Sequence, residues 1–394
     1  MSLRPLPDPP SPEWAPIVES IRKQYNEGLP FFNRALLQRV ALQIHLYENG
    51  MLTNKPYAIE NIRGDLVSLD IDPDTESPVF KDVRCNHGDR KNGPYIYYRS
   101  IQSMLTHRDM KQFDAEKAFL PLVVMFPSAA GRCHAHHVHE SRSTSADDLQ
   151  ASILPTTFYP SELTTIFNLD RRAWEQSEQY AYLKGQLEAH SDRLSQIDSV
   201  VALGCGSLAH GRARCQFATT QHALAFSLRK VLSRMHPENS RVRQSLRQAR
   251  KKEPVDLVVR GVLQDPAYTE VDEAVLSDMG MEIYKDPFGF LEMNDNSFVV
   301  SIDVNTPAQQ IIENLARPAA IIRMTHVEEL NGENVAQCTD PSSSRVNKML
   351  LEEYDLVKLR YHEHLRHICL YIKKQKPEGK AGSNRASGSS STKN

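Results

Sequence analysis

The stretch VVALGCGSLAHGRARCQF, residues Val200 to Phe217, joins an apolar run to two closely spaced glycines and then to a segment able to form a helix. Glycine allows a tight turn and a close approach of a phosphate, and the amino end of a helix favours an anion. Gly204-Cys-Gly206-Ser-Leu-Ala209 satisfies the GxGxxG/A pattern of dinucleotide-binding turns. The stretch predicts a strand, a turn and a helix. Its turn either binds a small nucleotide-like ligand or only closes a tight corner.

Apolar runs and helical segments alternate regularly beyond this turn. Five runs predict buried strands, over residues 199–204, 255–266, 281–286, 297–303 and 319–326. Continuous apolar strands separated by helices are typical of a parallel sheet that is covered on both faces. The sequence therefore predicts an α/β fold, Rossmann-like and doubly wound, with a mainly parallel sheet of at least five strands. Ligands of such sheets bind at the carboxyl ends of the strands.

Composition divides the chain into four predicted parts. Residues 1–126 form a mixed α/β extension, and residues 127–152, rich in Ser, Ala, His and charge, form a flexible linker. Residues 153–372 form the Rossmann-like domain, with its core over 196–330 and long helices over 170–193 and 345–372. The low-complexity residues 373–394 are expected to be a disordered tail.

The overall composition bounds the possible partners and location. Among 394 residues, 47 Lys and Arg balance 49 Asp and Glu, so nucleic acid is an unexpected partner. The amino-terminal residues lack the apolar core of a signal peptide, and no apolar run is long enough to span a bilayer. We expect no membrane association, and a location in the cytoplasm and also the nucleus.

Comparison with known nucleotide motifs leaves the glycine turn undecided. A dinucleotide-binding fold has an acidic residue about 20 residues after the turn that binds the ribose, but no acidic residue lies between Ser207 and Pro237. Asp265 follows the second predicted strand, after a long insert that contains the basic run 241–252. A phosphate-binding loop needs Lys-Ser/Thr where Arg212-Ala213 stands. A methyltransferase pattern needs an acid at position 202 and a glycine at position 208, and neither is present.

Two histidine-rich stretches contain side chains that can bind a metal ion. CHAHHVH, residues 133–139, contains metal-ligating side chains, but the predicted linker around it offers no ordered partner ligands. HEHLRH, residues 362–367, departs from HExxH because Arg366 takes the place of the second histidine, and we expect His364 and His367 on one face of a helix. No metal site is predicted. No nucleophile elbow or Ser-His-Asp order is found either, so the catalytic residues are unknown.

Several elements occur in an order typical of one family. They are QDPAYT from Gln264, PFGFLE from Pro287, the run SIDVNTP from Ser301 and the opening VVALGCGSL. Over residues 196–329 the chain resembles the sensitivity-to-red-light-reduced-like (SRR-like) domain, especially its fungal-type members. The resemblance implies a Rossmann-like domain in cytoplasmic or nuclear proteins, some of them associated with light signalling and circadian timing. It assigns no reaction.

The residues that the resemblance marks follow successive strands, so they are expected to line one cleft at the carboxyl edge of the sheet. The candidate cofactor-binding residues are Gly204, Gly206, Ser207, Gln221, Asp265, Tyr268, Asp286 and Asn305. The cofactor itself is unknown. In the alternative interpretation these residues line no cleft, and the Asp-Pro pairs only form turns.

Two classes of function follow from these observations. The first is an SRR-like regulatory protein that acts through protein partners or as a small-ligand sensor. The second is an enzyme of the transferase kind that depends on a nucleotide or methyl-donor cofactor. The absence of an acid–base or nucleophilic constellation in the sequence favours the first.

Overall fold

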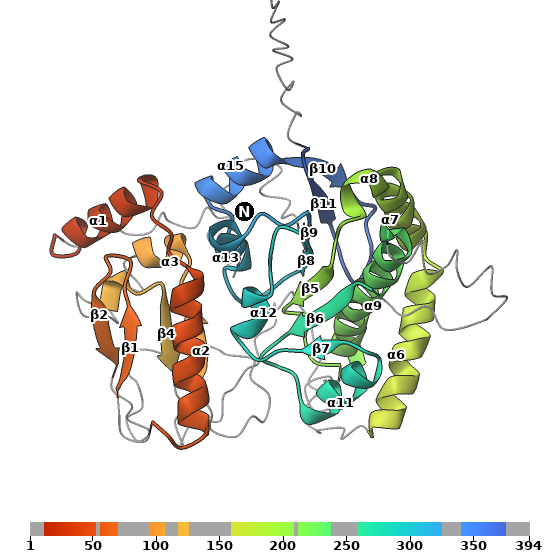
Figure 1. Cartoon of the computed structure of the whole chain (residues 1–394), viewed down its shortest axis with the longest axis horizontal. Coiled ribbons are helices and arrows are strands. Elements are labelled where there is room, and N and C mark those ends of the chain that lie inside the picture. The colour runs from red at the N-terminus through yellow and green to blue at the C-terminus, as the bar shows by residue number, and fades with distance from the viewer. Residues whose placement is uncertain are drawn as a thin grey trace, which may run out of the picture.

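The computed structural model describes residues 12–52, 56–69, 94–106, 117–125, 159–208, 212–237, 258–324 and 340–375, without the side chains of 125 and 212–215. Its centre is a seven-stranded sheet with the order β10-β11-β9-β8-β5-β6-β7 (Figure 1). The strands are β5 (Ser199–Leu203), β6 (Arg260–Gln264), β7 (Glu282–Ile283), β8 (Ser297–Ser301), β9 (Ala320–Met324), β10 (Tyr354–Lys358) and β11 (Ile368–Lys373). The five strands β5 to β9 are parallel, which confirms the predicted α/β Rossmann-like fold.

The order of the parallel strands places a topological switch point between β5 and β8. From β5 the chain winds outward to β6 and β7, and then returns to the other side of β5 to form β8 and β9. Every residue of β5, β8 and β9 is buried, as the continuous apolar runs predicted, because helices cover both faces of the sheet. In such sheets the crevice beside the switch point is the usual place for a ligand.

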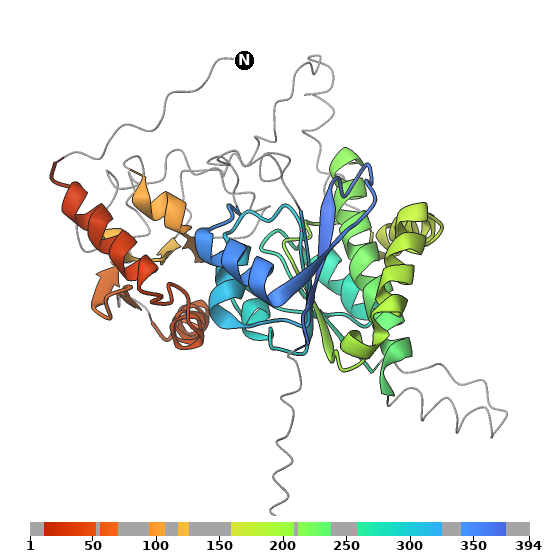
Figure 2. The ribbon, with the colours of Figure 1, turned by 90° about the horizontal axis from the view of Figure 1, so that it is seen from above.

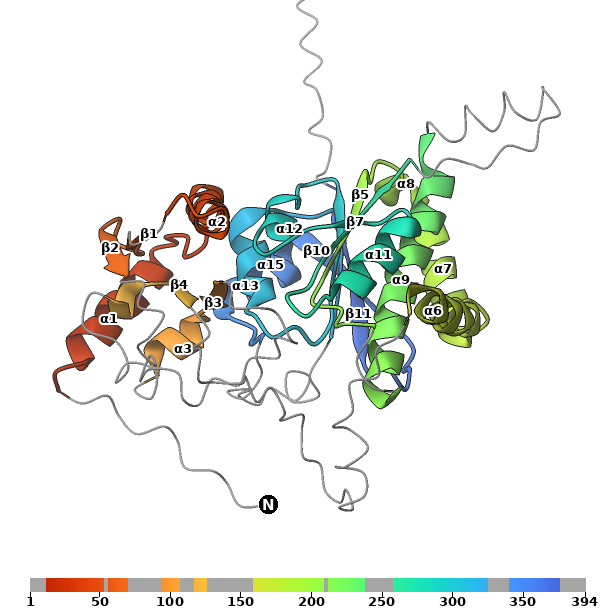
Figure 3. The same ribbon diagram turned by 90° about the horizontal axis from the view of Figure 1, so that it is seen from below.

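Each face of the sheet is covered by its own set of helices, and Figure 3 shows these layers edge on. One face carries α6 (Pro160–Glu175), α7 (Glu178–Ala189), α8 (Ser191–Leu194), α9 (Arg212–Met235) and α11 (Glu270–Asp278). The other carries α12 (Phe288–Leu291), α13 (Ala308–Leu315) and α15 (Ser344–Glu353). None of the helices formed by the described residues is long and apolar enough to cross a membrane.

The amino-terminal extension packs against the second face, outside α12, α13 and α15 (Figures 1 and 2). Its elements are α1 (Ala15–Asn26), α2 (Arg34–Glu48), β1 (Tyr57–Glu60), β2 (Leu66–Leu69), β3 (Tyr95–Tyr98), α3 (Ile101–Leu105), the 3₁₀ turn Lys117–Phe119 and β4 (Leu122–Met125). Side chains such as Phe32 and Leu37 belong to the same apolar cluster as Val201 and Val299 of the sheet. The extension and this face of the sheet therefore share one core.

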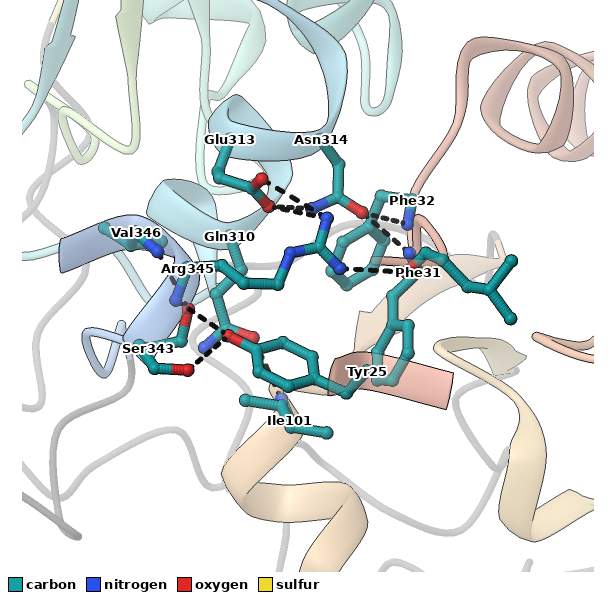
Figure 4. Close-up of polar contacts among 12 residues, drawn as sticks. Tyr25, Phe31, Phe32, Ile101, Gln310, Glu313, Asn314, Ser343, Arg345 and Val346 are labelled. Atoms are coloured by element: carbon teal, nitrogen blue, oxygen red, sulfur yellow. Dashed lines mark hydrogen bonds and ion pairs between the residues drawn. The ribbon is translucent and has the colours of Figure 1, made fainter. Parts of the chain in front are cut away.

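Polar contacts reinforce this shared core, and Figure 4 draws them. The side-chain oxygen of Asn314 on α13 accepts hydrogen bonds from the backbone N–H groups of Phe31 at 2.7 Å and Phe32 at 3.1 Å. Arg345 on α15 donates to the carbonyl oxygen of Leu29 at 2.9 Å. The segment between α1 and α2 is thus fixed by the Rossmann-like domain.

The predicted helix over residues 345–372 is wrong. Only α15 is helical, and the chain then forms the hairpin β10–β11, whose second strand pairs with β9. Arg366 turns this hairpin with a φ of 57°. By periodicity alone, the apolar run in β11 fits a buried strand and a buried helix equally well. It forms a strand because it pairs with the open edge of β9.

The predicted helix over residues 170–193 is wrong in its bounds. The chain begins α6 at Pro160 and starts a new helix, α7, at Glu178. Ser177 separates them, because its hydroxyl accepts the Tyr180 N–H at 3.1 Å and caps α7. The predicted linker 127–152, the basic run 241–252, and the predicted tail from residue 376 lie outside the described residues.

Candidate functional site

The glycine turn follows β5 at the switch point. Gly204 has a φ of 66° and Gly206 a φ of 78°, both in the left-handed region that favours glycine. The Gly204 N–H donates to the Gln264 carbonyl oxygen at 2.9 Å, which ties the end of β5 to the end of β6. A Cβ at Gly204 would lie 2.4 Å from Cγ1 of Val304, so this position requires glycine for space as well.

Asp265 accepts one backbone amide of the glycine turn and one of its own loop. Its Oδ2 accepts a hydrogen bond from the Gly206 N–H at 2.6 Å, and its Oδ1 accepts one from the Ala267 N–H at 2.7 Å. The residue is only 8% exposed. A carboxylate of the protein thus accepts an amide of the kind that a dinucleotide-binding turn offers to a phosphate.

Asp272, which the sequence reasoning missed, occupies the next donors. Its Oδ1 accepts the Leu208 N–H at 2.7 Å, and its Oδ2 accepts the Ser207 hydroxyl at 2.7 Å. The same carboxylate caps α11 through the Thr269 N–H at 2.7 Å. The signal in the sequence is the capping box Thr269-x-x-Asp272, which points to a carboxylate at the start of a helix but not to its second partner.

These two carboxylates decide what the turn can bind. They satisfy the backbone donors of Gly206 and Leu208 and bring negative charge to the turn. A phosphate would have to displace them and would meet like charge. The arrangement stabilises the turn itself and disfavours an anionic ligand there.

Tyr268 pairs with His222, a residue of α9. The Nδ1–H of His222 donates to the Ala218 carbonyl oxygen at 2.7 Å, so Nε2 is the acceptor of the Tyr268 hydroxyl at 2.9 Å. Burial lowers the pKa of His222 to about 4 and raises the pKa of Tyr268 well above its usual value. Burial also raises the pKa of the Cys205 thiol, with the nearby Asp265 as a second cause. All three side chains are uncharged at neutral pH.

Asp286 connects the sheet edge to the extension. Its Oδ1 accepts the Tyr98 hydroxyl of β3 at 2.6 Å and the Gln264 side-chain amide at 3.0 Å. The Gly289 N–H donates to Oε1 of Gln264 at 2.6 Å, which completes the network. Burial and the charge of Asp286 raise the pKa of Tyr98 well above its usual value. Tyr98 and Gln264 are therefore hydrogen-bond partners of Asp286 that the sequence did not indicate.

The two remaining candidate residues lie apart from these networks. Gln221 is 1% exposed, and its Oε1 has no hydrogen-bond partner among the described residues. Asn305, in the loop after β8, is exposed and makes no hydrogen bond to the turn within the described part of the chain. A second buried atom without a partner, Oγ of Ser301, lies at the end of β8.

The structure thus brings Gly204, Gly206, Ser207 and Asp265 together at one turn, with Tyr268 beside it. Asp286 belongs to the contact with the extension, and Asn305 stands alone in the described residues.

The candidate metal motifs have different outcomes. Residues 133–139 lie outside the described residues. His364 and His367, expected on one face of a helix, instead lie in the connection between β10 and β11, so that prediction is wrong. Over the ranges that the structure covers, no three His, Cys, Asp or Glu side chains are grouped to hold a metal ion.

A mainly parallel sheet with a switch point and a glycine turn defines a Rossmann-like α/β protein. The SRR1 domain model matches residues 183–385, and the chain belongs to the SRR1 domain family. No curated protein sequence matches it significantly.

Among solved structures, the chain is weakly similar to the N-methyltransferase NodS from Bradyrhizobium japonicum WM9. The identity is 9% and the TM-score 0.28, over 51% of this chain and 99% of that one. The same enzyme in complex with S-adenosyl-L-homocysteine gives 10% and 0.26, over 54% and 99%.

Proposed function

We propose that this SRR1-family protein is a regulatory protein that acts through protein partners, and that its Rossmann-like core is a scaffold rather than a catalyst. One observation carries the proposal. The carboxylates of Asp265 and Asp272 hold the amide donors of the glycine turn, at 2.6 Å for Gly206 and 2.7 Å for Leu208. The protein itself thus uses two of the amide donors that a nucleotide enzyme would offer to an anion.

The side chains around the turn support the same conclusion. General acid–base chemistry at neutral pH needs a group whose pKa lies near 7. His222 has a pKa of about 4, and burial moves the pKa values of Tyr268 and Cys205 upward, away from neutrality. Each of these groups serves packing and hydrogen bonding. The proposal places the protein in the cytoplasm and nucleus, as the family resemblance implies.

A thermal-shift screen of the full chain tests the proposal. The probes are ADP, ATP, NAD⁺, NADP⁺ and S-adenosylmethionine, at concentrations up to about 1 mM. We expect no rise in melting temperature with any of them. A rise that is lost in Asp265→Asn, accompanied by steady conversion of the probe, would establish the cofactor-dependent enzyme instead.

A small-ligand sensor is the second candidate, and two buried atoms favour it. Oε1 of Gln221 and Oγ of Ser301 have no partners among the described residues, and unpaired buried polar groups are costly. An uncharged polar ligand that reached Gln221 would satisfy its Oε1 without opposing Asp265. Adenosine and the other nucleosides are the probes, and a melting shift that Gln221→Leu abolishes supports the sensor over the pure scaffold.

A further inference from the structure

The seven-stranded sheet ends in two unequal edges (Figure 1). One edge is β7, which has only two residues, Glu282 and Ile283. The other is β10, which has five residues, from Tyr354 to Lys358, and pairs with β11 on one side. An edge strand presents a row of N–H and C=O groups that can pair with another strand. Of these two edges, β10 is the one long enough to extend the sheet.

Alternate residues of β10 direct their main-chain groups away from β11. The Glu353 carbonyl oxygen accepts the Lys374 N–H at 2.8 Å, and the Leu359 N–H donates across the same ladder at 3.3 Å. The odd-numbered residues therefore direct their N–H and C=O groups toward β11, and the even-numbered residues direct theirs to the opposite side. Among the described residues, none forms a hydrogen bond with the main chain of Leu356 or Lys358. The outer edge of β10 is thus open.

Exposed leucines accompany this open edge. The side chain of Leu356 lies on the same face of the sheet as Tyr354, which packs in the core shared with the extension, because side chains alternate along a strand. Leu356 is 48% exposed, and Leu351 on α15, the helix that leads into β10, is 78% exposed. Burial of both side chains would remove apolar surface from water, which favours association at this edge.

The two ends of the edge carry opposite charges. Glu352 lies at the end of α15, Lys358 is the last residue of β10, and both side chains are exposed. Neither forms an ion pair within the part of the chain that the structure covers, whereas Asp355 pairs with Arg193 at 2.6 Å. An antiparallel strand from a second copy brings the lysine of each copy to the glutamate of the other. It also brings that lysine to the carboxyl end of α15, which favours a cation.

The hydrogen-bond pattern of β10 is complementary to itself. When two copies run antiparallel and are centred on Leu356, this residue faces its counterpart, and Tyr354 faces Lys358 of the other copy. All three direct their N–H and C=O groups outward, so each of these pairs is a hydrogen-bonded pair. The same register sets the two exposed leucine side chains against each other. One two-fold axis relates the copies, as in most homodimers.

We propose that a second copy of this chain pairs with β10, antiparallel and centred on Leu356, so that two seven-stranded sheets join into one. The partner is a second copy because the hydrogen-bond register, the charges and the apolar surface of this edge all match themselves under one two-fold axis. The strands β11, β9 and β8 separate this edge from β5 and its glycine turn. The dimer therefore goes beyond the proposed function and leaves the turn unchanged.

Sedimentation velocity of the full chain measures the association, at protein concentrations from about 1 to 100 μM. We expect a shift from the 44.7 kDa monomer toward twice that mass as the concentration rises. Leu356→Lys sets like charges opposite each other at the two-fold axis and should leave only monomer. The matched control is Leu169→Lys on α6, where the leucine is 59% exposed, and it should associate as the wild type does. Both variants should keep the wild-type circular dichroism spectrum, since both positions are exposed.

Charge exchange provides the second readout. Lys358→Glu should raise the dissociation constant of the dimer about fivefold, because it places a carboxylate near Glu352 of the other copy. Adding Glu352→Lys to the same chain restores opposite charges and should return the constant toward its wild-type value. Monomer at every concentration, a dimer that survives Leu356→Lys, or a double variant that dimerises no more tightly than Lys358→Glu overturns the inference. None of these outcomes depends on nucleotide binding in the thermal-shift screen.

Discussion

Asp265 accepts the backbone N–H of Gly206 at 2.6 Å, so the end of β6 supplies to the glycine turn the negative charge that a bound phosphate supplies in nucleotide-binding relatives of the fold. The acid that the sequence offers at the end of the second strand is therefore present in the expected place. It is directed at the protein's own backbone.

Gly204→Ala should destabilise the protein strongly. The backbone at this position is left-handed, which an alanine rarely adopts, and the new Cβ would lie 2.4 Å from Cγ1 of Val304. These two effects together should lower the free energy of unfolding by about 3 kcal/mol. Gly64 has a φ of 88° with open space around it, so Gly64→Ala should cost only about 1 kcal/mol. Urea denaturation measures both. Equal losses for the two variants would show that the space at Gly204 is not constrained.

Asp272→Asn should also be destabilising, by about 3 kcal/mol, because the amide group cannot accept from Leu208, Ser207 and Thr269 as both carboxylate oxygens do. Asp278→Asn, at an exposed position of the same helix, is the matched control and should be neutral. Thermal unfolding compares the pair. A neutral Asp272→Asn would mean that the carboxylate does not hold the turn.

His222 should make stability depend on pH. Its pKa falls from 6.5 to about 4 on folding because of burial, so the unfolded chain binds the proton more tightly. Above pH 6.5 the neutral imidazole leaves the free energy of unfolding undiminished. As the pH falls from 6.5 toward 4, the free energy of unfolding falls by about 3 kcal/mol. Urea denaturation across this range should show a steeper loss for wild type than for His222→Gln. Parallel curves would indicate that His222 titrates normally.

Asn314→Ala should loosen the extension without unfolding the sheet. It leaves the N–H groups of Phe31 and Phe32 without their acceptor, at a cost of about 1–3 kcal/mol. Amide hydrogen exchange should accelerate at these two residues while β5 and β8 stay protected. Unchanged exchange at Phe31 would contradict the role assigned to Asn314, and Asn26→Ala serves as the exposed control.

The parallel sheet was predictable because its strands are buried on both faces and appear in the sequence as short apolar runs between helices. The turn was predictable from Gly204 and Gly206, whose spacing reflects two left-handed residues. Local signals of this kind need no knowledge of distant segments.

The contacts that determine the chemistry of the site were not predictable in the same way. Asp272 lies in the sequence as a helix-capping residue, and its bond to Ser207 arises only when α11 packs beside the turn. One partner of Asp286 is Tyr98, 188 residues away in the extension. Likewise, the strand β11 forms because β9 has an open edge, which no pattern within residues 368–373 reveals.

Amide hydrogen exchange at the glycine turn tests the central claim most directly. We expect the N–H groups of Gly206 and Leu208 to exchange slowly in the free protein, because Asp265 and Asp272 hold them at 2.6 and 2.7 Å. ADP, NAD⁺ and S-adenosylmethionine should leave these rates unchanged. Fast exchange that becomes slow when one of these compounds is added would contradict it, and would show that the turn is an open nucleotide site.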